Sequence, residues 1–204
     1  CDDGVDNDCD TQIDEGCVID DDDDGYGVED DCNDGDENIH PTAADTPDDE
    51  AADTNCDGID GDADALVFVS EGATGIGTMT SPLSDIQAGI AACQGIGESC
   101  TGVAVSQGNY TGRITVVDGI SVYGGYGTDW KERGDSYPVK VTADDPGDDG
   151  LVNVDALDIL SPTTVERLKL VHGAAAAALG TSAYGVRAID AAGLRLRHLQ
   201  VTAG

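Results

Sequence analysis

Residues 20–31 read Asp-Asp-Asp-Asp-Asp-Gly-Tyr-Gly-Val-Glu-Asp-Asp, and this stretch decides how the first third of the chain folds. Asp20, Asp22 and Asp24 occupy alternate positions, and Gly25 follows them directly. This spacing puts carboxylate oxygens on one side of a tight loop, which is the arrangement that a hard cation requires. The sequence therefore predicts that this loop binds calcium.

The spacing fits a calcium loop that supplies ligands from positions 1, 3, 5, 7, 9 and 12, with glycine at position 6 and a backbone carbonyl at position 7. It recurs from Asp53, and again from Asp6, where Thr11 replaces the glycine and Cys17 occupies position 12. A set beginning at Asp31 is predicted to complete a neighbouring site. The predicted metal ligands are Asp20, Asp22, Asp24, Tyr26 and Asp31; Asp53, Asn55, Asp57, Ile59 and Asp64; Asp6, Asp8, Asp10, Gln12 and Asp14; and Asn33, Asp34 and Asp36 beside Asp31.

Charge divides the chain near Ala65. Residues 1–64 contain 27 acidic residues and no Lys or Arg, whereas residues 65–204 contain the other 15 acidic residues and all 9 basic ones. We therefore expect two domains, 1–64 and 65–204. Because like charges repel, the first is either a disordered acidic tail or a segment neutralised by cations, and its regular spacing favours cations. Such a surface repels phosphate, so nucleic acid is not an expected partner.

The identity of the ion follows from the donor atoms. Magnesium prefers fewer carboxylates and keeps its water, whereas copper and zinc favour imidazole or thiolate ligands. No helical periodicity flanks the loops, so they form a string of loops rather than paired EF-hands. Several Ca²⁺ ions are therefore the expected cofactor.

The seven cysteines contain no C-x-x-C pair, which argues against zinc binding or redox catalysis. Disulfides in an oxidising compartment are the better interpretation, although spacing leaves their connectivity open. A leftover cysteine suggests that the chain is a piece of a longer polypeptide. The predicted pairs are Cys93–Cys100, Cys32–Cys56 and Cys1–Cys17, with Cys9 left over.

The acidic segment resembles a known family. The motifs are Cys-Asp-Asp-Gly-Val-Asp-Asn-Asp-Cys-Asp at 1–10, Ile-Asp-Glu-Gly-Cys at 13–17, Asp-Gly-Tyr-Gly at 24–27 and Asp-Cys-Asn-Asp-Gly-Asp at 31–36. They resemble the acidic metal-binding repeats of bacterial surface proteins of the MopE-like type, which are similar to thrombospondin type 3 calcium repeats. The resemblance covers roughly residues 1–64 and implies an extracellular or outer-surface location. Thr11 departs from the family, which usually has glycine there.

A short pattern recurs from Ala65 onward, in which two apolar residues flank one residue and a glycine follows three positions later. Alternation of this kind predicts a short strand with one face inward, and the glycine turns the corner. Short strands without hairpin turns favour a solenoid whose coils stack on a shared core. Val117, Val165 and Leu196 precede the last three occurrences by three positions. The five occurrences begin at Val67, Val103, Ile120, Leu168 and Leu199.

An amphipathic helix is predicted over 81–93, with Ser81 as N-cap, Pro82 in the first turn, and Leu83, Ile86, Ile90 and Ala91 on one face. It would cover the open end of the first coil, and further coils are expected to follow at the other end. The motifs at 67–70, 81–90, 105–110 and 120–126 resemble the start of a right-handed parallel β-helix of the pectin-lyase-like class. The expected fold is mostly β: an irregular calcium-loop segment followed by a right-handed parallel β-helix with an N-terminal capping helix.

These features favour a non-catalytic, calcium-stiffened spacer attached to a β-helix, in a secreted or surface-exposed stalk, fibre or adhesin. Expected partners are calcium, other copies of the chain and surface polysaccharide; no apolar run reaches membrane-spanning length. The first alternative is an extracellular polysaccharide lyase, with candidates Arg167, Lys169, Arg195 and Arg197 beside Asp155 or Asp158. The second is a glycan-binding adhesin with a stacking platform of Tyr123, Tyr126 and Trp130.

Overall fold

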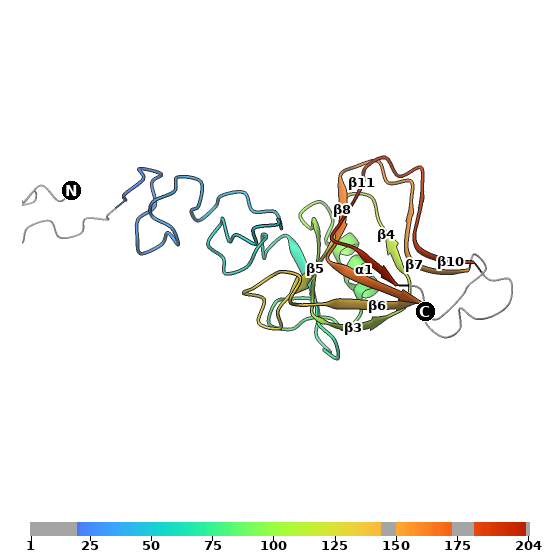
Figure 1. Ribbon diagram of the computed structural model, residues 1–204. Helices are drawn as coiled ribbons and strands as arrows, with labels where there is room; N and C mark the ends of the chain where they lie inside the picture. The colour runs from blue at the N-terminus through green and yellow to red at the C-terminus, as the bar shows by residue number, and fades with distance from the viewer. Residues whose placement is uncertain (1–19, 144–149, 173–181, 203–204) are drawn as a thin grey trace, which may run out of the picture. The chain divides into compact units, whose positions relative to one another are not determined.

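Short alternating strands form three parallel sheets in the second part of the chain (Figure 1). The computed structural model describes residues 20–143, 150–172 and 182–202. The chain divides into two units, Cys1–Asp62 and Ala63–Gly204. The predicted 6–17 loop and the predicted Cys1–Cys17 pair lie outside the described residues.

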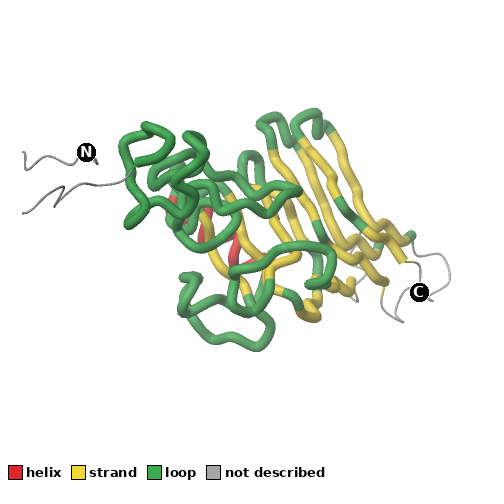
Figure 2. The backbone as a smooth tube through the Cα atoms, turned by 60° about the vertical axis from the view of Figure 1, so that its left-hand side comes forward, coloured by secondary structure: helices red, strands yellow, loops and turns green. Residues whose placement is uncertain are grey.

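All strand pairings between named strands of the second unit are parallel, and the chain visits the three sheets in turn. Figure 2 shows the strands stacked side by side in successive layers. The first sheet contains β1 (Leu66–Val69), β2 (Gly102–Ser106), β5 (Ser121–Tyr126), β8 (Thr163–Glu166) and β11 (Leu194–Arg197). The second contains β3 (Gly108–Thr111), β6 (Val139–Ala143), β9 (Leu168–His172) and β12 (Gln200–Thr202), and the third contains β4 (Ile114–Val116), β7 (Leu151–Leu157) and β10 (Ala183–Ile189). The unit is therefore mostly β, with a parallel architecture compatible with a β-helix.

Columns of aligned apolar residues build the core. In the first sheet, Val67, Val103, Val122, Val165 and Leu196 lie in register on successive strands. The first four belong to the buried core cluster, whereas Leu196 on the last strand is 45 % exposed. Each coil thus covers the apolar residues of the coil before it, and Leu196 is exposed because no described strand stacks on β11.

The five occurrences of the recurring sequence pattern do not fall on equivalent strands of successive coils. Its first three occurrences form β1, β2 and β5 in the first sheet, but its last two form β9 and β12 in the second. Val165 is aligned with Val122 rather than with Val117. The error arose because every inward-facing strand of a three-sheet coil shows the same alternation, so alternation alone does not identify the sheet.

The predicted helix exists but begins later, as α1 (Ile86–Ile96), with Asp85 rather than Ser81 as its N-cap. Asp85 accepts a hydrogen bond from the Ala88 backbone N–H at 2.7 Å. Residues before it are extended because Leu83 exchanges backbone hydrogen bonds with β1: its N–H donates to Phe68 and its carbonyl accepts from Ser70. The helix buries Ile86, Gly89, Ile90 and Cys93 in the core, whereas Ala91 is exposed.

Glycine at 89 lets this helix approach β1 closely. A Cβ atom there would lie 2.7 Å from the Val69 Cγ2 atom and 3.0 Å from Val103 Cγ1. The disulfide Cys93–Cys100, which was predicted from sequence, ties the helix to the start of β2. None of the helical segments in the described part of the chain has the length and apolar character that a membrane crossing needs.

The loop between β5 and β6 covers the outer face of the first sheet. Trp130 packs edge-on against Phe68 at 4.9 Å between ring centroids, and its indole N–H donates to the Met79 carbonyl at 3.1 Å. Tyr123, Tyr126 and Trp130 are all buried, at 6 %, 0 % and 5 % exposure. The stacking platform expected for a glycan-binding adhesin is therefore wrong, because these rings hold the loop to the sheet.

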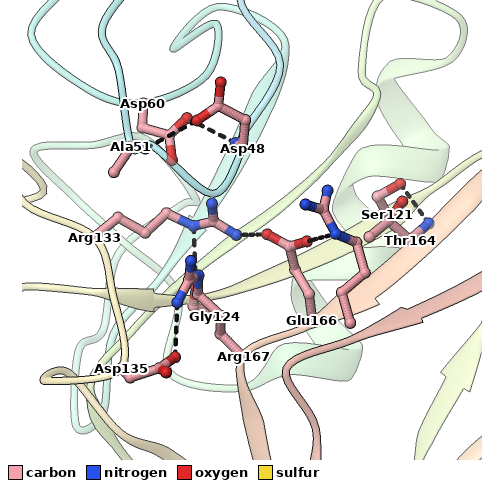
Figure 3. Close-up of polar contacts among 11 residues, drawn as sticks. Asp48, Ala51, Asp60, Ser121, Gly124, Arg133, Asp135, Thr164, Glu166 and Arg167 are labelled. Carbon is pink, nitrogen blue, oxygen red and sulfur yellow. Dashed lines mark hydrogen bonds and ion pairs between the residues drawn. The ribbon is translucent and has the colours of Figure 1, made fainter.

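A buried ion pair reinforces this loop. Arg133 pairs with Glu166, and its Nε donates to the Gly124 carbonyl at 3.1 Å (Figure 3). The guanidinium also lies over the rings of Tyr123 and Tyr126. Because Glu166 is fully buried, removal of Arg133 would leave this carboxylate with the longer, 3.6 Å contact to the Arg197 Nε atom, and weakening a buried ion pair is costly.

We predict that Trp130→Ala lowers the free energy of unfolding of the second unit by about 3–5 kcal/mol, the usual cost of deleting a buried tryptophan side chain. Chemical denaturation followed by far-ultraviolet circular dichroism measures this. Lys131→Ala, at an exposed neighbouring position, is the control and should leave the transition unchanged. An equally small effect of both substitutions would contradict the packing described here.

Asp118 joins two coils and supplies a pH-dependent contribution to stability. It accepts hydrogen bonds from the backbone N–H groups of Leu160 and Ser161 and from the Ser161 hydroxyl. The Ser161 backbone hydrogen bond, followed by the other two, lowers the pKa of Asp118 below its ordinary value.

We predict that Asp118→Ala lowers the melting temperature of the second unit at neutral pH. Because the pKa of Asp118 is depressed in the fold, its contribution is present above its unfolded-state value and disappears as pH falls through the folded value. The difference between wild type and variant should therefore vanish in strong acid. A difference in melting temperature that stays constant down to the lowest pH would refute the assignment.

Candidate metal site

Three carboxylates converge in the 20–31 loop, as the alternation in sequence predicts. Oxygens of Asp20, Asp22 and Asp24 lie within 4.8 Å of one another. These three residues are half-buried, whereas the intervening Asp21 and Asp23 are exposed. One side of the loop therefore collects the carboxylates, and the other side faces solvent.

Local hydrogen bonds shape the backbone of this loop. The N–H of Gly25 donates to Asp20 at 3.0 Å, that of Asp24 to Asp22 at 3.2 Å, and that of Tyr26 to Asp24 at 2.8 Å. Gly25 has a φ of +97°, which glycine adopts readily and other residues rarely do. The glycine at position 6 thus allows the chain to turn around the carboxylates.

Asp31, the predicted ligand at position 12 of this loop, has a buried carboxylate. It is only 7 % exposed, and its Oδ2 atom has no hydrogen-bond partner. One buried oxygen on each of Asp20, Asp22 and Asp24 also has none. Burying an unpaired charge is costly, so these oxygens mark a place where a positive ion would be strongly stabilised.

The electrostatics of Asp22 agree with this arrangement. Desolvation by its surroundings raises the pKa of Asp22, and the negative charges of Asp24, Asp31 and Asp20 raise it further, while a hydrogen bond from the Asp24 N–H opposes them. Asp31 thus acts electrostatically on the same site as the three alternating residues. A cation among them would reverse the unfavourable interaction.

The 53–64 loop repeats the backbone of the first. The N–H of Gly58 donates to Asp53 at 2.8 Å and that of Ile59 to Asp57 at 3.1 Å. Position 6 is Gly58, with a φ of +98°, and position 4 is Cys56, with a φ of +60°, matching the +65° of Asp23 in the first loop. The loops differ in that the Asn55 amide already donates to the Asp57 carboxylate at 3.0 Å.

The other predicted ligands have separate environments. Asp34 accepts a hydrogen bond from the Asp21 N–H at 3.1 Å, which ties the following turn to the first loop. Asp36 accepts from the Asn38 backbone and side chain, and these bonds lower its pKa. Asn33 donates its N–H to Asp31. Asp64 is exposed, and the carbonyls of Tyr26 and Ile59 remain predicted ligands.

Nitrogen and sulfur donors near the loops are already engaged. Cys32 and Cys56 form the predicted disulfide, so neither supplies a thiolate to a metal. His40 stacks on Tyr26 at 5.2 Å between ring centroids, and its Nδ1 lies 2.9 Å from the Pro41 carbonyl. The donor atoms facing the site are therefore carboxylate oxygens, which suit a hard cation.

Two features of this unit were not expected from sequence. The first is the stack of Tyr26 on His40, with the tyrosine hydroxyl 2.9 Å from the Thr42 hydroxyl. The second is the positive φ at position 4 in both loops. No pattern in the sequence pointed to either feature, because position 4 is Asp23 in one loop and Cys56 in the other and neither is a glycine.

Three of the six residues considered for lyase chemistry, Asp155, Arg167 and Arg197, form ion pairs. Asp155 is buried and pairs with Arg187, at 2.6 Å between Nη2 and Oδ2, and with Arg113 at 3.6 Å. Arg167 pairs with Asp135 at 2.7 Å, and the Arg197 Nε lies 3.6 Å from Glu166. A cleft of about 140 Å³ is lined in part by Arg167, Lys169 and His198. Asp155 thus joins strands of the third sheet rather than serving as an accessible base. Two candidates, Asp158 and Arg195, remain; Arg195 lies on β11, in register with Thr164 of β8.

Together, the fold and these loops define a two-part chain, with a parallel β-structured unit and an acidic unit that could hold metal ions. Comparison with protein-family models, with curated protein sequences and with solved structures finds no significant match.

We predict that Asp31→Asn has opposite effects with and without calcium. In a chelator, the variant should resist thermal unfolding of the acidic unit better than wild type, because a buried negative charge has been removed. In millimolar calcium it should be less stable and bind the ion at least about tenfold more weakly, since even a supporting residue of a metal site costs that much. Calorimetry in the two buffers measures both. A shift of the same sign in both would show that Asp31 is not a ligand.

Proposed function

We propose that the chain is a non-catalytic, calcium-binding structural segment of an extracellular or outer-surface protein. Calcium ions would order the acidic unit, which is attached to a parallel β-helix. The observation that carries the proposal is the convergence of the Asp20, Asp22 and Asp24 carboxylates, each with one buried oxygen that has no hydrogen-bond partner. The buried Asp31, which also has such an oxygen, acts electrostatically on Asp22. The described residues of the acidic unit bury only Ile59 among their Val, Ile, Leu, Met and aromatic side chains, so hydrophobic burial provides little stabilisation there.

Calcium suits these loops better than other ions. It accepts six to eight oxygens in flexible geometry, and a set of four carboxylates with a backbone carbonyl is typical of its sites. Magnesium requires a stricter octahedron and retains water, and zinc favours nitrogen and sulfur ligands. Because unfolded acidic chains lack a preformed site, the binding energy of the ion contributes directly to folding.

The location and the coil handedness follow from general constraints. Disulfides such as Cys32–Cys56 and Cys93–Cys100 persist in oxidising compartments outside the cytosol. Calcium reaches there the millimolar concentrations at which extracellular modules are occupied. Parallel strands joined by crossover connections are right-handed in nearly all proteins, so the proposed sense of the coils is right-handed. Other copies of the chain and surface polysaccharide remain the proposed partners.

A carbohydrate-active enzyme is the second candidate, and the cleft beside Arg167, Lys169 and His198 is the observation that favours it. Two lysines, Lys140 and Lys169, are aligned on neighbouring strands near this cleft. The pairing of Arg167 with Asp135 and of Asp155 with Arg187 reduces the charge available to a substrate. Degradation of acidic polysaccharide by the full chain, abolished in Lys169→Ala, would favour this candidate.

We predict that calcium added to the chelator-treated full chain releases or absorbs heat in titration calorimetry and reduces the radius of gyration in X-ray scattering. Asp22→Asn/Asp24→Asn should lose one or more bound ions. Asp21→Asn/Asp23→Asn removes the same charge from the exposed side of the same loop and should retain them. If wild type shows neither heat nor compaction at millimolar calcium, the proposed function is wrong.

A further inference from the structure

The Cys32–Cys56 disulfide connects the two loops at positions that matter to both. Cys32 directly follows Asp31, the buried carboxylate at position 12 of the 20–31 loop. Cys56 lies inside the 53–64 loop, between Asn55 and Asp57, and holds the left-handed φ of position 4. A covalent bond thus runs from the end of one predicted ion loop to the middle of the other.

The disulfide also lies against the Asp31 carboxylate. The Cys56 sulfur is 3.9 Å from the Asp31 Oδ1 atom, and the Cys32 N–H donates to the same sulfur at 3.2 Å. The Asp31 Oδ1 atom accepts a hydrogen bond from the Asn33 N–H at 2.8 Å, while its Oδ2 atom has no partner. The position of the Asp31 carboxylate therefore depends on where the second loop places Cys56.

The second loop has a reason to move when it binds an ion. The Asn55 amide donates to the Asp57 carboxylate, so two predicted ligands on either side of Cys56 contact each other directly. An ion at this loop would draw both oxygens toward itself and fix the backbone between them. That backbone is Cys56, and its sulfur would then hold Asp31 in one place.

We propose that Cys56 is a positioning residue for the 20–31 site and that cation binding at the two loops is positively coupled through the Cys32–Cys56 disulfide. The inference rests on the proposed function, since it requires both loops to bind ions. The first ion to bind would order the shared segment and bear the loss of conformational entropy. The second ion would then bind to a segment that is already ordered, and would bind more tightly. Linkage requires the effect to be reciprocal between the two loops.

Terbium luminescence in the full chain tests the coupling, because Tyr26 is the only aromatic residue of Phe, Trp or Tyr type within residues 1–64. Its ring can sensitise a terbium ion bound in its own loop. Asp57→Asn disables the second loop at an exposed ligand without touching the first. Glu50→Gln removes one charge from an exposed position nearby that is not a predicted ligand, and Tyr26→Leu identifies the signal of the first loop.

In the disulfide-bonded protein, Asp57→Asn should weaken terbium binding at the 20–31 loop by about fivefold or more, the lower range of measured allosteric couplings. Glu50→Gln should change it by less than about twofold. In a Cys32→Ser/Cys56→Ser background, Asp57→Asn should also have less than about a twofold effect, and the double-mutant cycle isolates the part carried by the disulfide.

Several results would overturn the coupling. Equal weakening by Asp57→Asn with and without the disulfide would mean that charge alone acts, and no weakening would mean that the loops are independent. If the serine background binds no terbium, wild type and Asp57→Asn, both with the disulfide intact, are compared again in about 1 M salt, where the screening length is about 3 Å. If Asp57→Asn still weakens terbium binding in high salt, the coupling is supported; if the weakening disappears, the coupling is refuted. Absence of terbium binding in wild type would instead refute the proposed function.

Discussion

Repulsion among crowded carboxylates is the interaction on which the acidic unit depends. Three aspartates of the 20–31 loop, Asp20, Asp22 and Asp24, bring their carboxylates together, and each has one buried oxygen without a hydrogen-bond partner. Desolvation raises the pKa of Asp22, and the charges of Asp24, Asp31 and Asp20 raise it further. Backbone N–H groups donate hydrogen bonds to the same side chains and so shape the loop, but they do not neutralise the negative charge of the carboxylates. Under the proposed function, a bound cation would supply the positive charge that offsets this repulsion, as in other proteins whose folding depends on a metal ion.

The second unit is stabilised in a different way. Its strands bury aligned columns of Val, Ile and Leu between three sheets, and each coil depends on the coil before it. Polar groups are used at points where coils must be joined. The amide of Asn153 donates to the carbonyls of Val141 and Val171 on two neighbouring strands. Asp155 pairs with Arg187 of β10 and with Arg113, which directly precedes β4. The unit thus combines a repetitive core with individual polar ties between layers.

Much of this architecture was predictable because the responsible signals are local. The spacing of Asp20, Asp22, Asp24 and Gly25 predicted a loop with one acidic side, and the alternation around Val67, Val103 and Val122 predicted short inward-facing strands. The Cys93–Cys100 disulfide was predicted from the closeness of its partners in sequence, and the structure confirms it. The predicted Cys32–Cys56 disulfide is also present, although spacing had left that connectivity open. Calcium binding, the right-handed sense and the function are predictions that the geometry leaves for experiment.

What was mispredicted depends on contacts between distant segments. Trp130 resembled an exposed platform residue because nothing in its own loop shows that Phe68 and Met79 lie beneath it. Ser81 is a good N-cap by type, but Leu83 pairs with β1, so the helix starts only after Asp85. Sequence alternation also did not assign Leu168 and Leu199 to the second sheet, because all three sheets impose the same period on their strands.

The bond between Cys32 and Cys56 has a mechanical consequence for the acidic unit when the chain is pulled from its ends. It encloses a stretch with a sequence separation of 24 residues, which when pulled straight would span roughly 80 Å. Tension applied to the ends of the chain bypasses that stretch, since the load passes through sulfur. Asp31, at position 12 of the 20–31 loop, lies just before this stretch, and Cys56, at position 4 of the 53–64 loop, ends it. The start of the second loop, residues 53–56, is therefore shielded from stretching, whereas the whole of the first loop lies in the part of the chain that carries the load.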